Sequence, residues 1–369
     1  MKPIRVLIVD DSVVVRRLLS EILATDPEID VVGTAASGSI ALAKIPQTQP
    51  DVVTLDVEMP DMNGLDTLSA IRKAHPDLPV IMFSALTGLA AATTLEALAR
   101  GATDYVTKPT AVGGREGATA HIREQLLPKV KTLGGGEVAR QWVPSAPPRA
   151  RALPAVLPPP ASTRVEVLAV GASTGGPNAL THFFSQLPAH FPVPIVVVQH
   201  MPPVFTKLFA ERLTAACALE FHEAAGGEVL QPGKAYIAPG DYHMRVVRDG
   251  TVTRVELNQD APENSCRPAV DVLFRSVSAV YGAGTLAVVL TGMGQDGLRG
   301  SEAIRGTGGQ VIVQDEASSV VWGMPGFIAK AGLAQAVLPL AELSGEVLRR
   351  VALSRVVNTS TPNLERHVS

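Results

Sequence analysis

A serine framed by glycines is the most informative feature of this chain of 369 residues. After the apolar residues 167–170, residues 171–175 (GASTG) fit the pattern G-x-S-x-G, and Pro177 then opens a helix-like segment. The pattern is typical of a sharp strand-to-helix turn that lifts a serine hydroxyl above the end of a sheet. Glycine suits such a turn because it adopts backbone angles that a side chain forbids and lets a substrate approach closely. The motif therefore predicts that Ser173 is a nucleophile for covalent hydrolysis.

Two other interpretations of this motif stay open at this point. Glycine-rich strand-to-helix turns also cradle phosphates and dinucleotides, and Ser173 could simply cap the helix that follows. The run lacks both the Lys-Ser/Thr ending of a P-loop and the spacing G-x-G-x-x-G. On its own, the motif favours a nucleophile no more than an anion cradle or a helix cap.

Two further residues could complete a catalytic triad with Ser173. His200 follows the apolar residues 195–198, and Asp296 lies in a glycine-containing loop after residues 286–290. All three side chains would then project from the carboxyl edge of one parallel sheet, as a triad requires. We therefore predict that Ser173 is the nucleophile, His200 the base and Asp296 the carboxylate that orients the base.

Backbone N–H groups beside Ser173 could stabilise the oxyanion of such a reaction. Thr174 is the next residue, so its N–H is one predicted donor, and the loop 291–297 could supply the second. The chain order Ser, His, Asp differs from that of the α/β-hydrolases and from both protease orders. An α/β-hydrolase arrangement could instead use Asp241 and His243, although two neighbours on one loop would form a relay only with difficulty.

A second set of polar residues ends the predicted strands of the first part of the chain: Asp10, Asp11, Asp56, Ser84 and Lys108. Carboxylates gathered at one sheet edge repel one another unless a cation neutralises them, and hard oxygen ligands select Mg²⁺. A carboxylate beside Mg²⁺ can accept a phosphoryl group whose oxygens a lysine and a hydroxyl hold. The aspartates could instead cap a helix and begin a turn. Five such residues in register favour the phosphoacceptor site.

Alternating strand and helix patterns must position both sets of residues. In the first region we predict strands at 4–9, 31–34, 52–55, 80–83 and 105–107, and helices at 13–24, 39–45, 65–73, 89–99 and 119–133. In the second we predict strands at 165–170, 195–198, 235–237, 286–290 and 310–313, with helices at 205–215, 270–281 and 298–305. Residues 244–255 alternate around Asp249-Gly250, which indicates a hairpin. The predicted fold class is α/β, with two doubly wound parallel-sheet domains and an antiparallel hairpin in the second.

Prolines and glycines concentrate between the two regions and cannot hold a helix or a central strand there, so this segment is a predicted linker. The predicted organisation is a first domain over residues 1–133, a linker over 134–163, a catalytic domain over 164–355 and a polar C-terminal tail over 356–369.

The composition excludes several classes of protein. A net charge of −3 argues against a dedicated nucleic-acid binder. Two distant cysteines suit a reducing compartment and offer neither a disulfide framework nor a zinc site. The N-terminus does not read as a signal peptide, and no apolar run reaches membrane-spanning length. We expect a soluble, cytoplasmic protein that is not inserted in a membrane.

The first domain resembles a response-regulator receiver domain, which has a flavodoxin-like fold. The resemblance rests on the Asp10-Asp11 pair, on Asp56 within LDVEMPDMNG, and on Lys108-Pro109. The roles that it implies are Mg²⁺ binding for Asp10, Asp11, Asp56 and the backbone carbonyl of Glu58, phosphoryl acceptance for Asp56, phosphoryl contact for Ser84 and Lys108, and an aromatic switch for Tyr105.

The second domain resembles the catalytic domain of CheB-type chemotaxis methylesterases, which is Rossmann-like. The resemblance is carried by GASTGGP from residue 171, QHM from 199, NSCRPAVDVLF from 264, TGMGQDG from 291 and WGMP from 322. It implies that Ser173, His200 and Asp296 form the triad and that the backbone N–H of Met293 assists the oxyanion.

The two resemblances together imply a phosphorylation-activated protein-glutamate methylesterase. Its substrates would be glutamate methyl esters on the cytoplasmic helices of chemoreceptors, it would release methanol, and it would also deamidate receptor glutamines. A chemotaxis histidine kinase would supply the phosphate, and the esterase step would need no cofactor. Arg267 could steady an acidic receptor surface or serve equally well as a structural ion-pair partner. The alternative function is a phosphorylation-switched binding module without esterase turnover.

Overall fold

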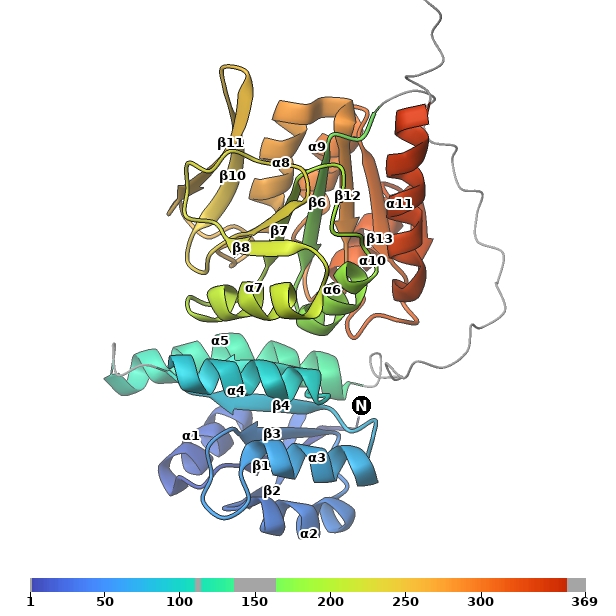
Figure 1. Ribbon diagram of the computed structural model, residues 1–369. Helices are drawn as coiled ribbons and strands as arrows, with labels where there is room; N and C mark the ends of the chain where they lie inside the picture. Colours follow the sequence, from blue (N-terminus) through green and yellow to red (C-terminus); the bar gives the residue numbers. More distant parts are fainter. Residues whose placement is uncertain (1, 110–113, 136–163, 357–369) are drawn as a thin grey trace, which may run out of the picture. The chain divides into compact units, whose positions relative to one another are not determined.

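The structure is a computed structural model that describes residues 2–109, 114–135 and 164–356 (Figure 1). The chain divides into two compact units, Met1–Ser145 and Ala146–Ser369. Most of the predicted linker and all but the first residue of the predicted tail lie outside the described residues, so these limits stay predictions.

The first unit is built on a parallel sheet of five strands in the order β2-β1-β3-β4-β5. The strands are β1 (Ile4–Val9), β2 (Ile29–Ala35), β3 (Val52–Asp56), β4 (Val80–Ser84) and β5 (Asp104–Thr107). Strands rich in valine, leucine and isoleucine can be buried on both faces, and β3 and β4 are buried along their whole length. The strand order is that of a flavodoxin-like fold, as predicted.

Five helices cover this sheet: α1 (Val13–Leu23), α2 (Gly38–Thr48), α3 (Gly64–Ala74), α4 (Gly88–Ala99) and α5 (Gly114–Gly134). The first of them packs against α5, while α3 packs against both α2 and α4. Ser12, Ser37, Asn63 and Thr87 cap the first four helices by accepting a backbone N–H three residues on. Because Ser12 caps α1, the two aspartates before it are not needed as caps.

The second unit contains a parallel sheet of seven strands in the order β14-β13-β12-β6-β7-β9-β8. The strands are β6 (Val167–Ala172), β7 (Ile195–Gln199), β8 (Glu220–Glu223), β9 (Lys234–Ile237), β12 (Thr285–Val289), β13 (Gln310–Gln314) and β14 (Ala336–Leu338). The chain leaves β6 toward β7 and later returns to β12 on the other side, so the strand order reverses between β6 and β12. This is a Rossmann-like topology, and such a reversal point is where α/β sheets bind ligands.

Two edge strands of this sheet were not predicted. The β8 segment reads EFHE, whose polar residues suit an exposed edge but obscure a strand pattern. The β14 segment is only three residues long. The predicted hairpin is confirmed, because β10 (His243–Asp249) and β11 (Val252–Asn258) pair in an antiparallel ladder.

The helices of the second unit are α6 (Gly176–Ser185), α7 (Phe205–Ala216), α8 (Val270–Tyr281), α9 (Leu298–Gly306), α10 (Met324–Lys330) and α11 (Leu340–Val356). Figure 1 shows α8 and α9 side by side, and α8 also packs against β6 and the hairpin strand β10. A core cluster joins Val270, Leu273 and Phe274 of α8 to buried residues of the central strands. This packing holds the start of α8 near the carboxyl end of β6. Among the described helices, none combines the length and apolar character needed to cross a membrane.

Candidate active site and phosphorylation site

The turn that carries Ser173 connects β6 directly to α6. Gly175 has a φ of 74°, a left-handed conformation that favours glycine. A Cβ at Gly171 would lie 2.6 Å from the side chain of Val270, so a larger residue would push α8 away. The residue at the N-cap position of α6 is Gly175, which makes no side-chain cap, and the Ser173 hydroxyl faces a histidine instead. The helix-cap interpretation of Ser173 is therefore wrong.

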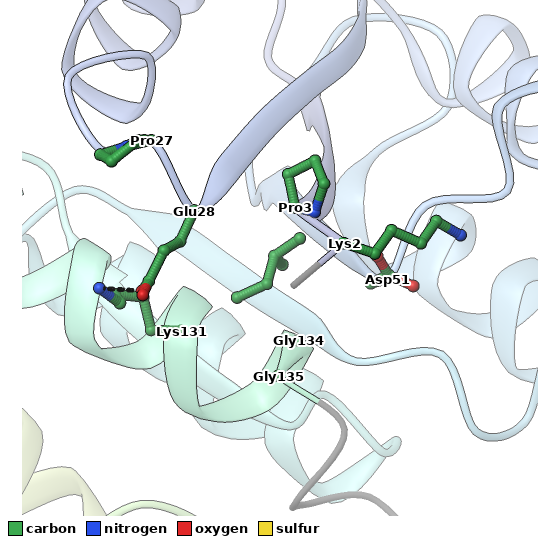
Figure 2. A pocket seen from close by; sticks show the side chains of 9 residues that line it. Lys2, Pro3, Pro27, Glu28, Asp51, Lys131, Gly134 and Gly135 are labelled. Atoms are coloured by element: carbon green, nitrogen blue, oxygen red, sulfur yellow. Dashed lines mark ion pairs between the residues drawn. The ribbon is translucent and has the colours of Figure 1, made fainter.

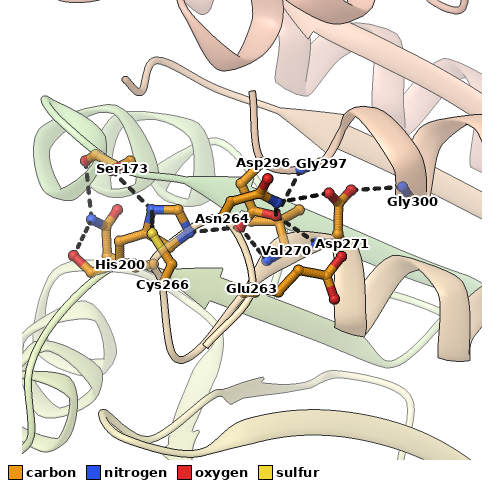
Figure 3. A network of polar contacts seen from close by, with 12 residues as sticks. Ser173, His200, Glu263, Asn264, Cys266, Val270, Asp271, Asp296, Gly297 and Gly300 are labelled. Carbon is orange, nitrogen blue, oxygen red and sulfur yellow. Dashed lines mark hydrogen bonds and ion pairs between the residues drawn. The ribbon is translucent and has the colours of Figure 1, made fainter. Parts of the chain in front are cut away.

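Ser173, His200 and Asp296 form one hydrogen-bonded chain (Figure 3). The Oγ atom of Ser173 lies 3.1 Å from Nδ1 of His200, and Nε2 of His200 lies 2.8 Å from Oδ2 of Asp296. A carboxylate only accepts hydrogen bonds, so the ring proton belongs on Nε2 and Nδ1 is left to accept from the serine hydroxyl. In the chymotrypsin-type triad, Nε2 contacts the serine and Nδ1 contacts the aspartate, so the two ring nitrogens have the opposite partners here.

Backbone N–H groups surround the Asp296 carboxylate. Val270 N–H donates to its Oδ2 at 2.6 Å, and the N–H groups of Asp271 and Gly297 donate to its Oδ1, each at 3.0 Å. Burial by itself would raise the pKa of Asp296, but the hydrogen bond and charge of His200 and these backbone donors bring it below its ordinary value. Asp296 is only 2% exposed and is therefore held as an ionised partner for the histidine.

His200 has a third polar neighbour besides Ser173 and Asp296. The Sγ atom of Cys266 lies 3.5 Å from Nδ1 of His200. Burial lowers the pKa of His200, but Cys266 and Asp296 outweigh it and raise that pKa to about 10. This neighbour was not predicted from the sequence, because no spacing pattern links Cys266 to a histidine 66 residues away.

The loop that carries Met293 lies against the nucleophile turn. Ser173 N–H donates to the carbonyl of Thr291 at 3.0 Å, and the Thr291 hydroxyl donates to the carbonyl of Thr174 at 2.9 Å. A Cβ added at Gly292 would lie 2.8 Å from the Cβ of Ser173. Thr291 and Gly292, which directly precede Met293, therefore lie against the turn that carries Ser173 and Thr174, while the roles of Thr174 and Met293 as oxyanion donors stay predictions.

The alternative pair Asp241 and His243 does not join this site. Both ring nitrogens of His243 bind backbone groups, the carbonyl of Ala261 and the N–H of Ala269. Asp241 accepts from Nε of Arg267 at 3.0 Å. Arg267 also donates to two backbone carbonyls in the segment before it, so the structure favours the structural ion-pair interpretation of this arginine.

In the first unit, Asp10, Asp11 and Asp56 come together at the carboxyl ends of β1 and β3. One carboxylate oxygen from each lies within 4.8 Å of the others. Nζ of Lys108 lies 2.8 Å from Oδ2 of Asp56 and 3.3 Å from Oδ2 of Asp10. Burial raises the pKa of Asp56 to about 6, although Lys108 opposes this effect. Three converging carboxylates match the oxygen donors that Mg²⁺ prefers.

The aspartate cluster opens onto a pocket of about 760 Å³ whose lining includes Asp11, Asp56, Glu58 and Lys108. Glu58 N–H also lies 3.3 Å from Oδ1 of Asp56, so the chain folds back over the carboxylate here. These four predicted site residues are therefore brought together at one opening of the surface.

Ser84 and Tyr105 lie on the neighbouring strands but turn elsewhere. The Ser84 hydroxyl accepts from Thr94 of α4 at 2.7 Å and lies 3.3 Å from the carbonyl of Ala90. It is therefore bound to α4 rather than to Asp56 or Lys108. Tyr105 is buried, and burial together with the charge of Asp104 raises its pKa well above the ordinary value.

A different pocket, of about 660 Å³, lies at the amino ends of the strands, around Pro3, Pro27 and Gly134 (Figure 2). Lys131 in its lining already pairs with Glu28 and with Asp26. Asp51 accepts the backbone N–H of Arg5 at 2.8 Å. Glu28, Asp51 and Lys131 thus have partners within the fold, and none of the predicted site residues lies in this pocket.

Fold and sites together define a class of protein, an α/β serine hydrolase preceded by a receiver domain. Family models agree on both parts: residues 6–114 match the response regulator receiver domain, and residues 168–347 match CheB methylesterase. The chain belongs to the family of CheB methylesterases that carry a receiver domain.

Relatives of this chain share its full organisation. A protein-glutamate methylesterase/protein-glutamine glutaminase of Trichodesmium erythraeum is 52% identical to this chain. The matched region covers 95% of this chain and 100% of the relative. A protein of the same description from Nocardioides sp. is 50% identical over 96% of this chain and 97% of its own. The crystal structure of the Thermotoga maritima CheB methylesterase catalytic domain is 40% identical, with a TM-score of 0.50, over 51% of this chain and 99% of that domain.

Proposed function

We propose that this protein hydrolyses glutamate methyl esters on the cytoplasmic helices of chemoreceptors, releases methanol, and is activated by phosphorylation of its receiver domain. The observation that carries the proposal is the continuous contact from Ser173 through His200 to Asp296 at the point where the strand order reverses. The relatives from Trichodesmium and Nocardioides are protein-glutamate methylesterases by name, which supports the ester as the substrate.

The proposed reaction uses Ser173 as the nucleophile and His200 as the base. Nδ1 of His200 takes the hydroxyl proton while Oγ bonds to the ester carbonyl carbon, and Asp296 stabilises the imidazolium that forms. The N–H groups of Thr174 and Met293 would bind the oxyanion. When the tetrahedral species collapses, the C–O bond to the methoxy group breaks and His200 returns the proton, so methanol leaves. Water then hydrolyses the acyl-enzyme by the same proton route, which frees the receptor glutamate and Ser173.

Deamidation of receptor glutamines fits the same residues. An amide carbonyl passes through an equivalent tetrahedral species, and His200 would protonate the leaving nitrogen so that ammonia departs. Both relatives are also named protein-glutamine glutaminases, which supports this second activity.

The receiver unit supports control by phosphorylation, with a chemotaxis histidine kinase as the proposed phosphate source. Asp10, Asp11 and Asp56 would hold Mg²⁺ with the carbonyl of Glu58, and the bound ion would neutralise charge on the phosphoryl group. Lys108 contacts Asp56 and Asp10, which supports a role for this lysine in binding a phosphoryl oxygen on Asp56. Ser84 would have to release α4 before its hydroxyl could do the same.

The test is methanol release from a methylated receptor by the full chain, with and without a small-molecule phosphodonor and Mg²⁺. We expect turnover that rises with the phosphodonor and disappears in Ser173→Ala. Turnover that persists in Ser173→Ala would remove the nucleophile assignment. A wild-type protein that binds the receptor, releases no methanol and leaves Ser173 unlabelled by a fluorophosphonate would point to the binding-module alternative.

A further inference from the structure

The two helices beside Asp296 are capped in an unusual way. Neither α8 nor α9 has a side-chain cap from the residue at its own N-cap position. The carboxylate of Asp296, which precedes α9, accepts the first N–H groups of α8. The carboxylate of Asp271, the second residue of α8, accepts the N–H of Gly300 in the first turn of α9 at 2.6 Å. Each aspartate therefore supplies the cap that the other helix lacks.

This reciprocal capping buries two carboxylates close together. Asp271 is 1% exposed and Asp296 is 2% exposed. Burial raises the pKa of Asp271 to about 6, and the charge of Asp296 adds to the effect. Two like charges in a water-poor site need a donor between them. Without such a donor, the arrangement would favour protonation or movement of one carboxylate.

Asn264 is that donor. Its Nδ2 lies 2.9 Å from Oδ2 of Asp271 and 3.0 Å from Oδ1 of Asp296 (Figure 3). Both neighbours only accept hydrogen bonds, so the amide nitrogen and not the amide oxygen must face them. Asn264 has a φ of 52°, a left-handed conformation that asparagine tolerates better than most residues. Its position in the loop thus matches its amide to both acidic groups.

The bonds of Asn264 also restrict the rotation of the Asp296 carboxylate. Oδ1 is held by Asn264, Asp271 N–H and Gly297 N–H, which leaves Oδ2 to face Nε2 of His200. We propose that Asn264 and Asp271 are positioning residues, which hold the Asp296 carboxylate in the one orientation that aligns His200 with Ser173. This inference rests on the proposed function of the triad and extends it to two residues that do not touch the reacting atoms.

Two substitutions at residue 264 distinguish the effect of the side-chain amide from the effect of the left-handed backbone conformation. Asn264→Gly keeps the left-handed conformation and removes the amide. Asn264→Asp keeps the size and replaces the donor by a third acidic group. The matched control is Ser276→Ala in α8, which removes a buried hydrogen bond to the carbonyl of Leu273 and another from the N–H of Val246 without touching the triad. The control measures what a loss of stability in α8 does to the reaction by itself.

The rate of Ser173 labelling by a fluorophosphonate reports the nucleophile directly and needs no receptor. It would be measured on the full chain with a phosphodonor and Mg²⁺, beside kcat and KM for methanol release. We expect labelling to fall about 10-fold in Asn264→Gly and about 100-fold in Asn264→Asp, because small displacements of a catalytic group cost rates of this order. The fall should appear in kcat with KM unchanged, and Ser276→Ala should lose stability only.

The pH profile supplies a readout that a merely structural role would not move. The charged and titratable groups around Asp271 and Asp296 include His200 with Cys266 beside it, Glu263 in its ion pair with Arg275, and Arg299 of α9. A third carboxylate at residue 264 favours protonated His200, so the acid limb of kcat/KM should move to higher pH by about 1 unit. The proposal would be refuted if Asn264→Asp labelled Ser173 at the wild-type rate and left the pH profile unmoved. Equal losses of the labelling rate in Asn264→Gly and Ser276→Ala would refute it as well.

The same measurements distinguish this inference from the proposed function. A wild-type chain that labels at Ser173 but releases no methanol would make the substrate assignment wrong and leave the positioning role to be judged by labelling alone. A wild-type chain that does not label would overturn both.

Discussion

At the scale of single residues, His200 lies between two groups that each favour its protonated form. Asp296 binds Nε2 and Cys266 lies beside Nδ1, and together they overcome the burial that lowers the pKa of the ring. A general base must be neutral to accept the serine proton. Turnover should therefore rise with pH through the pKa of His200 and be largest on the alkaline side.

Replacing Cys266 should move this pH dependence. In Cys266→Ala the raising influence of the sulfur is lost, so the pKa of His200 falls and the acid limb of kcat/KM shifts to lower pH. The measurement is the pH profile of methyl-ester hydrolysis. Cys217→Ala is the matched control, because this other cysteine contacts the carbonyl of Thr181 and not the triad. An acid limb that stays in place in Cys266→Ala would show that the thiol does not influence the base.

Asp296→Asn should lower kcat by about 10⁴-fold, the size of effect found when the aspartate of a serine-protease triad is replaced. An amide at this position no longer selects the ring tautomer with the proton on Nε2, so Nδ1 loses its ability to accept from Ser173. Single-turnover kinetics would measure the loss. Asp249→Asn, at the exposed tip of the hairpin, is the control and should keep wild-type rates.

The triad could be predicted from sequence because strand ends in a parallel sheet share one edge, and two of its members directly follow a buried strand. Asn264, Asp271 and Cys266 could not. Asn264 and Cys266 lie in a loop with left-handed residues, which has no periodic pattern. Asp271 lies in the first turn of α8, where the apolar period predicts the helix but gives no role to a polar side chain. The orientation of the Ser84 hydroxyl was equally hidden, because Thr94 on a separate helix determines it.

At the scale of elements, α8 and α9 can approach closely because residue 300 is glycine. A Cβ there would lie 2.4 Å from the Cβ of Phe274. Gly300→Ala should separate the helices, lengthen the bond from Gly300 to Asp271, and destabilise the unit by about 1–3 kcal/mol through overpacking. Denaturant unfolding would measure this, and Ser173 labelling should slow as well.

Gly306→Ala tests the specificity of that effect. Gly306 is the last residue of the same helix, and a Cβ there would meet nothing within 4 Å. Alanine is a better helix former, so this variant should keep its rate and be unchanged or slightly more stable. Equal destabilisation by the two substitutions would contradict the close-approach explanation.

The central strands and α8 were predicted well because long apolar periods dominate them. The helix 119–133 was predicted five residues too short at its start, since α5 begins at Gly114 and its first turns contain no apolar period. The edge strands β8 and β14 were missed for two different reasons. The exposed edge strand β8 carries polar residues that obscure the strand pattern, whereas β14 is apolar but only three residues long.

At the scale of the whole molecule, the receiver and the esterase lie on one chain, and control should depend on Asp56. In Asp56→Asn the phosphodonor should no longer raise methanol release by the full chain, because an amide cannot accept the phosphoryl group. Asp66→Asn, in the first turn of α3 and away from the aspartate cluster, is the matched control and should keep the response. A phosphodonor response that survives in Asp56→Asn would place the regulatory group elsewhere.

The chain order of the triad also affects how the enzyme is made. Ser173 and His200 are 27 residues apart, whereas Asp296 follows His200 by 96 residues. At about 5–20 residues per second, the ribosome needs roughly 5–20 s to add the missing carboxylate after the base has been synthesised. During that interval the nascent polypeptide carries a nucleophile and a base but lacks the strand and loop that complete the relay. The newly made chain is therefore inactive for that time, whatever the state of Asp56.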